Sequence, residues 1–143
     1  MHRLIFYHGT SVKVAAALVS DPMQLDVALG GGELGQGFYT SDEHSLEMVA
    51  RWAQLRDPEE GGAVVAITVD ASAYVRLSYR LFRTVKDVEA EWIGLKRKGL
   101  RKTRRYGVDV VIGPMATWDA RIQRKFESST AERLLKDSFW EFL

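Results

Sequence analysis

The feature that most constrains the fold is a run of residues at positions 63–69, Ala-Val-Val-Ala-Ile-Thr-Val, that is β-branched and apolar nearly throughout. A run without polar alternation predicts a strand that is buried on both faces and central in a sheet. A second run, 108–112, is followed by Gly113 and Pro114 and predicts another buried strand. Helical patterns occur between the strands without regular alternation. This order favours an α+β fold with a mainly antiparallel or split sheet over a doubly wound one.

Shorter patterns fill in the remaining elements. They predict strands at residues 4–7, 38–39, 74–77 and 121–127, and helices at 12–18, 41–56, 131–135 and from Thr84 onward. Ser11 is a candidate cap for the first helix. Thr40 and Glu43 have the spacing of a capping box, so the second helix is expected to begin there.

Composition supports a folded chain with its own core. The 143 residues are 46% hydrophobic and 27% charged, which predicts a single domain over 1–143. The net charge of +1 does not by itself predict a nucleic-acid partner. The absence of cysteine excludes disulfides, thiol catalysis and Cys-ligated zinc. The three histidines lack metal-ligand spacing, so no metal is expected.

From the N-terminal residues we expect no signal peptide. The apolar run in residues 1–6 is too short for a signal peptide, and no stretch has the length of a membrane span. We therefore expect a cytoplasmic protein without a membrane partner.

A glycine-rich segment stands out between the first two predicted helices. Residues 30–37 contain five glycines in eight positions, and Phe38 and Tyr39 follow directly. Glycine permits positive φ angles and lets a bound group approach the backbone closely. The segment is consistent with the wall of a ligand site, and equally with a surface turn.

A second candidate segment is Tyr7-His8-Gly9-Thr10-Ser11, at the predicted end of the first strand. An imidazole can hydrogen-bond a ribose hydroxyl, and an open glycine backbone can pair with a carboxamide. The alternative is a strand-end histidine that faces solvent.

Taken in order, these segments resemble the ADP-ribosyltransferases of the diphtheria-toxin and poly(ADP-ribose) polymerase type. The resemblance is nearest to the small bacterial members that act as toxins or toxin domains. It includes the Glu91-Trp92 pair, the strand-like stretch 108–116 and the segment around Gln123, and extends from Phe6 to about Leu135. It implies a split, mainly antiparallel sheet with flanking helices.

The resemblance also implies that NAD is a substrate and assigns roles around it. His8 would bond the adenosine-side ribose with the support of Thr10, and the backbone of Gly9 would hold the nicotinamide amide. Tyr39 would stack on the nicotinamide ring. The 30–37 loop would line the dinucleotide, and the residues expected to contact it there are Gly35, Gly37 and the adjacent Phe38.

The third catalytic position departs from the best-known pattern, in which the last core strand carries a glutamate. Gln123 occupies the matching place. An amide could bond the ribose but could not act as a general base. Glu127 lies on the same face of a strand as Gln123 and is the second candidate, with a charged strand-end residue as the alternative interpretation.

Seven of the ten residues at 96–105 are basic. They are Lys96, Arg97, Lys98, Arg101, Lys102, Arg104 and Arg105. The run could form a phosphate-binding edge for RNA or DNA, a docking surface for an acidic antitoxin or immunity protein, or a solvated helix end.

The resemblance thus predicts an NAD-dependent mono-ADP-ribosyltransferase that acts as a bacterial toxin, in the cytoplasm of the producer or of a target cell. It would release nicotinamide and modify a macromolecule, whether protein, RNA or DNA. An NAD glycohydrolase and a catalytically inactive NAD- or nucleic-acid-binding module remain alternatives. An RNA 2′-phosphotransferase is less favoured, because the characteristic arginine and second histidine of that family have no clear match.

Overall fold

The computed structural model describes residues 2–116 and 121–143, with Glu43 and Arg56 described by their backbone alone. The fold is α+β, and its strands pair mainly in antiparallel fashion. The residues group into two compact units. Unit 1 comprises Met1–Leu25, Thr40–Arg76 and Arg133–Leu143, and unit 2 comprises Asp26–Tyr39 and Leu77–Glu132. The single domain over 1–143 stays a prediction, and each unit is described in turn.

Unit 1 is built on the long strands β1 (Arg3–Ser11) and β5 (Gly62–Asp70). They pair antiparallel from Arg3↔Asp70 to Ser11↔Gly62. Strand β9 (Phe139–Phe142) pairs with the other edge of β5, so β5 is central. The apolar run at 63–69 predicted this position, and Val65, Ile67 and Val69 are fully buried. The apolar C-terminal residues thus form an edge strand.

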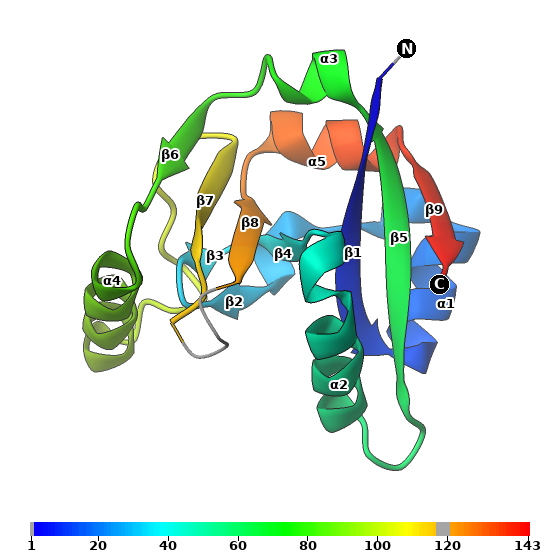
Figure 1. The fold of residues 1–143 in the computed structure, drawn as a ribbon, viewed down its shortest axis with the longest axis horizontal. Helices are drawn as coiled ribbons and strands as arrows, with labels where there is room; N and C mark the ends of the chain where they lie inside the picture. Colours follow the sequence, from blue (N-terminus) through cyan, green and yellow to red (C-terminus); the bar gives the residue numbers. More distant parts are fainter. Residues whose placement is uncertain (1, 117–120) are drawn as a thin grey trace. The chain divides into compact units, whose positions relative to one another are not determined.

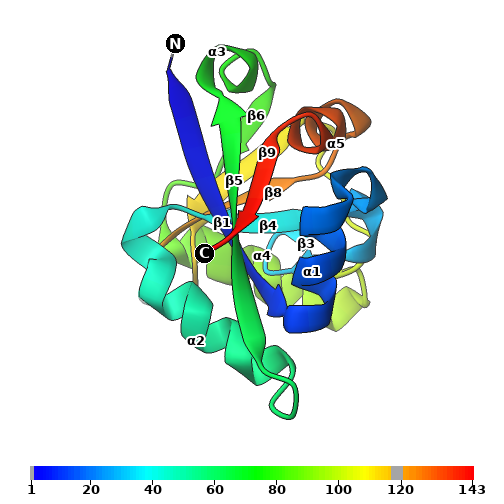
Figure 2. The same cartoon turned by 90° about the vertical axis from the view of Figure 1, so that its right-hand side faces the viewer.

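Two helices cover the paired strands of unit 1. Helices α1 (Val12–Ser20) and α2 (Leu46–Arg56) lie on opposite sides of the β1–β5 pair (Figures 1 and 2). The predicted cap of α1 is confirmed, because the Ser11 hydroxyl accepts a hydrogen bond from the Val14 amide at 3.2 Å. The core between α2 and the strands is apolar and comprises Tyr7, Val49, Val64 and Ala66.

Three local predictions in unit 1 are wrong. The first strand does not end at His8 but continues to Ser11, because its last residues pair with the start of β5. No capping box forms at Thr40, which lies in strand β4 (Phe38–Ser41), and the chain enters α2 through a 3₁₀ turn, Glu43–Ser45. The predicted strand at 74–77 does not form, because Tyr74 ends the short helix α3 (Ala71–Tyr74) and residues 75–77 form a turn and a bend. The Asp70 carboxylate caps α3 through the Ser72 amide at 3.1 Å.

Unit 2 contains strands β6 (Tyr79–Leu81), β7 (Val110–Pro114) and β8 (Ile122–Phe126). The pairing of β6 with β7 is parallel and that of β7 with β8 is antiparallel, and β4 follows β8 in the strand order. The strands predicted at 108–112 and 121–127 are confirmed with small shifts. Gly113 and Pro114 continue β7 rather than stopping it.

Helix α4 (Val85–Lys98) packs on β7 and confirms the prediction of a helix from Thr84. The Thr84 hydroxyl accepts from the Asp87 amide at 3.1 Å, and Gly99 ends the helix with φ +69°. Val88 joins Leu34, Phe82 and Val111 in a buried apolar cluster. The remaining elements are the 3₁₀ turns Pro22–Gln24 and Val27–Leu29, the short strands β2 (Gly31–Gly32) and β3 (Gly35–Gln36), and helix α5 (Ser129–Lys136).

Candidate functional site

The glycine-rich segment of unit 2 folds into a small hairpin of β2 and β3, closed by Tyr39. The Tyr39 hydroxyl donates to the Gly35 carbonyl at 2.6 Å and accepts from the Leu34 amide at 3.0 Å. Burial raises the pKa of Tyr39 above its usual range, so the phenol keeps the proton that it donates. The tip of the hairpin is therefore fixed to the aromatic residue that follows it.

Close packing explains the glycines of this hairpin. A Cβ at Gly32 would lie 2.8 Å from the Tyr39 ring, and one at Gly37 would lie 2.1 Å from the Lys125 side chain. Gly35 has φ +85°, and a Cβ there would lie 2.4 Å from the Arg104 carbonyl oxygen. The sequence suggested glycines that bend around a ligand. The structure shows that they also allow the chain to pack tightly against itself.

Glu33 sits between these glycines and reaches strand β8. Its Oε1 accepts from the Gln123 side-chain amide at 2.9 Å and from the Ala116 backbone amide at 2.8 Å. Both side chains are nearly buried, with exposed fractions of 8% for Glu33 and 4% for Gln123. Glu33 was missed at the sequence level, where the one available signal was a single acidic residue inside a glycine loop.

The contacts of Gln123 fix the orientation of its amide. Its Nε2 donates to Glu33 and also to the Pro114 carbonyl at 3.3 Å. Because both partners can only accept, the nitrogen must face them. Within residues 2–116 and 121–143, the hydrogen bonds of the Gln123 side chain are made by Nε2 and not by Oε1. That oxygen can accept a hydrogen bond from a hydroxyl but cannot act as a general base.

Glu127 is held in a buried ion pair with Lys125, and their exposed fractions are 2% and 0%. One Glu127 oxygen takes the bond from Lys125, and the other accepts from the backbone amides of Tyr106 at 2.7 Å and Gly107 at 3.0 Å. The Lys125 ammonium also donates to the Gln36 carbonyl at 2.9 Å. Burial lowers the pKa of Lys125, and Glu127 opposes that shift. These contacts give Glu127 a structural role that joins β8 to the hairpin and to the turn at 106–107.

Tyr106 is surrounded by charge. Its ring lies 5.1 Å from the Arg80 guanidinium, 4.8 Å from that of Arg104 and 4.9 Å from the Lys125 ammonium. Its hydroxyl donates to Glu91, the acidic residue of the Glu-Trp pair. Burial and the neighbouring Glu91 raise the pKa of Tyr106. Glu91, one of the residues that carry the resemblance, thus anchors α4 to the loop before β7.

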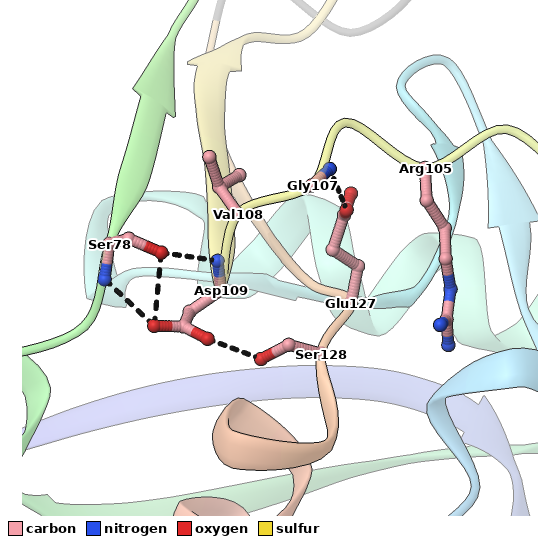
Figure 3. A pocket seen from close by; sticks show the side chains of 7 residues that line it. All are labelled: Ser78, Arg105, Gly107, Val108, Asp109, Glu127 and Ser128. Carbon is pink, nitrogen blue, oxygen red and sulfur yellow. Dashed lines mark hydrogen bonds between the residues drawn. The ribbon is translucent and has the colours of Figure 1, made fainter.

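A pocket of about 270 Å³ lies beside Glu127 (Figure 3). Its lining residues are Ser78, Arg105, Gly107, Val108, Asp109, Glu127 and Ser128. Asp109 accepts from the Ser78 amide at 2.8 Å and from the Ser128 hydroxyl, and Glu127 accepts from Gly107. The carboxylates of the pocket are therefore already bonded to its own walls, which is typical of a structural cluster.

The first candidate segment belongs to unit 1. His8 is partly buried in β1, whereas Gly9 and Thr10 are buried. A Cβ at Gly9 would lie 2.7 Å from the Val49 carbonyl oxygen and 3.1 Å from the Ala53 side chain, so close packing of α2 also requires this glycine. The structure brings Gly35, Gly37, Phe38, Tyr39, Gln123 and Glu127 together within unit 2, and it describes His8, Gly9 and Thr10 within unit 1.

Part of the basic run is attached to the glycine hairpin through Gln36. The Gln36 amide donates to the Arg104 carbonyl and its side chain donates to the Lys102 carbonyl, both at 2.8 Å, while Arg105 donates to Gln36 Oε1 at 2.7 Å. All seven basic side chains of the run are exposed. The backbone is thus ordered by the hairpin while the charges point to solvent.

Over residues 2–116 and 121–143, no group of three or more histidines and carboxylates has the arrangement of a metal site. None of the helices described is long and apolar enough to cross a membrane. Comparison of the sequence with protein-family models and with curated proteins finds no match.

Proposed function

We propose that the chain is an NAD-dependent mono-ADP-ribosyltransferase that releases nicotinamide and modifies a macromolecule. The observation that carries this proposal is the cluster in unit 2 where Tyr39 fixes the glycine hairpin and Glu33 of that hairpin holds Gln123. Two of the residues that the resemblance assigns to NAD are thus held by one small, ordered element. Positions 39 and 123 are far apart in the chain, so this clustering is independent support.

The proposed chemistry needs a clamp on nicotinamide and stabilisation of an oxocarbenium-like ribose. In the proposal, Tyr39, a partly exposed residue, stacks its ring on nicotinamide. Gln123 accepts a hydrogen bond from a hydroxyl of the nicotinamide ribose through Oε1, while its Nε2 stays bonded to Glu33 and Pro114. Gly35, Gly37 and Phe38 complete the proposed NAD contacts of unit 2. The roles of His8, Gly9 and Thr10, which belong to unit 1, rest on the resemblance alone.

One observation favours NAD glycohydrolysis as the second candidate. Gln123 is an amide, and Glu127 is occupied by Lys125 and two backbone amides. Neither is placed to take a proton from an acceptor. A site that breaks the nicotinamide–ribose bond without activating a macromolecule would pass the ADP-ribose to water.

The test is incubation of the purified protein with NAD labelled in its adenylate part and with a bacterial lysate. Transferase activity predicts label on protein or nucleic acid and equimolar free nicotinamide. Nicotinamide without labelled macromolecule supports the glycohydrolase, and the absence of both products overturns both. Expression of the wild type and of Tyr39→Ala in the same bacterium then tests the toxin role, which predicts growth arrest by the wild type alone.

A further inference from the structure

The charges of the chain are distributed unequally between its two units. Unit 2 contains thirteen Lys and Arg against nine Asp and Glu, a net charge of +4, whereas unit 1 contains seven against ten, a net charge of −3. The overall charge of +1 is therefore the sum of the charges of a basic unit and an acidic unit. Seven of the thirteen cations lie between Lys96 and Arg105, a stretch without an acidic residue.

We call these seven exposed side chains the basic surface: Lys96, Arg97, Lys98, Arg101, Lys102, Arg104 and Arg105. The backbone beneath them is held in place at both ends. Gly99 ends α4 in the left-handed conformation, the Leu100 amide returns to the Leu95 carbonyl at 2.9 Å, and Gln36 binds the segment 102–105. The cations are thus presented from an ordered scaffold.

Internal contacts account for only some of these cations. Lys96 lies over the Trp92 ring at 4.8 Å, Arg104 lies over Tyr106, and Arg105 bonds Gln36. In the part of the chain that the structure describes, four further side chains make no hydrogen bond, ion pair or ring contact. They are Arg97, Lys98, Arg101 and Lys102. The first two benefit from the C-terminal end of the α4 dipole, but Arg101 and Lys102 lie beyond the helix.

The composition of the surface distinguishes between classes of partner. Protein interfaces have an apolar core from which charged residues are depleted, whereas nucleic-acid interfaces are much more polar and positive. Within 96–105 the residues other than cations are Gly99, Leu100 and Thr103, and Leu100 is only 37% exposed. We propose that the basic surface binds the phosphate backbone of a nucleic acid. This binding does not require NAD and goes beyond the proposed activity.

The test is fluorescence anisotropy with labelled 20-nucleotide single strands of RNA and DNA and the DNA duplex, without NAD and at several salt concentrations. The test variant changes Lys98, Arg101 and Lys102 to Gln, which keeps the backbone bonds to Gln36. The matched control changes three exposed cations of unit 1, Arg3, Lys13 and Arg76, to Gln, so that net charge falls equally. Denaturation curves confirm that both variants fold.

We expect the wild type to bind at 50 mM salt, with log affinity falling linearly against log salt. Three lost phosphate contacts reduce that slope by about 2 for single strands to about 3 for a duplex, whereas the control leaves the slope unchanged. Binding of RNA alone, DNA alone or both supports the proposal and identifies the nucleic acid. No binding, equal weakening by both variants, or stronger displacement by poly-glutamate than by unlabelled nucleic acid would overturn it. Because NAD is omitted, failure here is distinguishable from failure of the transferase activity.

Discussion

The side-chain amide of Gln123 donates to the carboxylate of Glu33 across 2.9 Å, joining two residues that are 90 positions apart. One lies on the last strand of unit 2 and the other in the glycine hairpin. The position where the resemblance leads one to expect a glutamate thus holds an amide, and the carboxylate comes from a different segment. The pair keeps one acid and one amide together at this point.

This pairing predicts the effect of restoring the expected glutamate. Gln123→Glu places two carboxylates against each other and removes a donor from Glu33, so it should destabilise the protein. Adding Glu33→Gln restores one acid and one amide. In a double-mutant cycle on the free energy of unfolding, we expect a coupling of about 0.5–3 kcal/mol that favours the exchanged pair. Additive effects of the two substitutions would contradict the pairing.

Much of the secondary structure could be predicted from the sequence, because β5, β7, β8, α1 and α4 each carry a strong local signal. The apolar run at 63–69 and the Thr84 cap are examples. Predictions from local sequence signals were wrong where tertiary contacts determine the secondary structure. His8 and Gly9 looked like a strand end, yet pairing with β5 extends β1 through them. Thr40 had capping-box spacing, yet it lies in a strand.

The sequence pattern indicated the candidate site residues, but it did not indicate the residues with which they form hydrogen bonds. Nothing near Glu33 in sequence indicates that it contacts Gln123, and nothing near Glu127 indicates two backbone amides of the 106–107 turn. Such contacts depend on how distant segments pack, which periodicity and spacing do not encode. The glycine hairpin illustrates this limit, since its glycines meet the side chains and backbone of later segments.

Removing the hydroxyl in Tyr39→Phe should lower the free energy of unfolding. The substitution leaves the Leu34 amide and the Gly35 carbonyl of the hairpin tip without their partner, at an expected cost of about 1–3 kcal/mol. Chemical denaturation measures the change. The matched control is Tyr79→Phe, because Tyr79 is 66% exposed, and it should stay within about 0.5 kcal/mol of the wild type.

The Tyr39→Phe variant can also be tested through the dependence of its unfolding free energy on alkaline pH. Burial raises the pKa of Tyr39 in the folded state, so above the ordinary pKa of about 10 the unfolded chain releases a proton that the folded one keeps. Wild-type stability should therefore fall as pH rises above about 10. The decline should be smaller in Tyr39→Phe, and an equal decline in both proteins would contradict a buried, protonated phenol.

Substitutions at two glycines with positive φ distinguish the cost of backbone strain from the cost of steric crowding. Gly35 and Gly61 have φ +85° and +89°, but a Cβ at Gly61 has nothing within 4 Å, whereas one at Gly35 meets the Arg104 carbonyl. Gly61→Ala should cost about 1–2 kcal/mol of unfolding free energy, the cost of the left-handed conformation alone. Gly35→Ala should cost clearly more. Equal costs, measured by urea denaturation, would show that the hairpin is an open loop.

Breaking the buried ion pair with Lys125→Met should destabilise the protein by about 3–5 kcal/mol, because Glu127 would keep a buried charge without its cation. Arg133→Met removes a cation from an exposed pair with Asp137 and should cost less than about 1 kcal/mol. Thermal and urea denaturation compare the two variants. A cost for Lys125→Met as small as that of the exposed pair would remove Glu127 from the structural role assigned to it.

The most direct test of the proposed function is nicotinamide release, which both transfer and glycohydrolysis require. Purified wild type, His8→Ala, Tyr39→Ala and the surface control Tyr79→Ala are incubated with NAD, with and without bacterial lysate, and free nicotinamide is measured by chromatography. The proposed function predicts release by the wild type and Tyr79→Ala, and a loss of at least a hundredfold in folded His8→Ala and Tyr39→Ala, of the order expected when substrate-positioning groups are removed. No nicotinamide from folded wild type under either condition, or equal release by all four proteins, would contradict it.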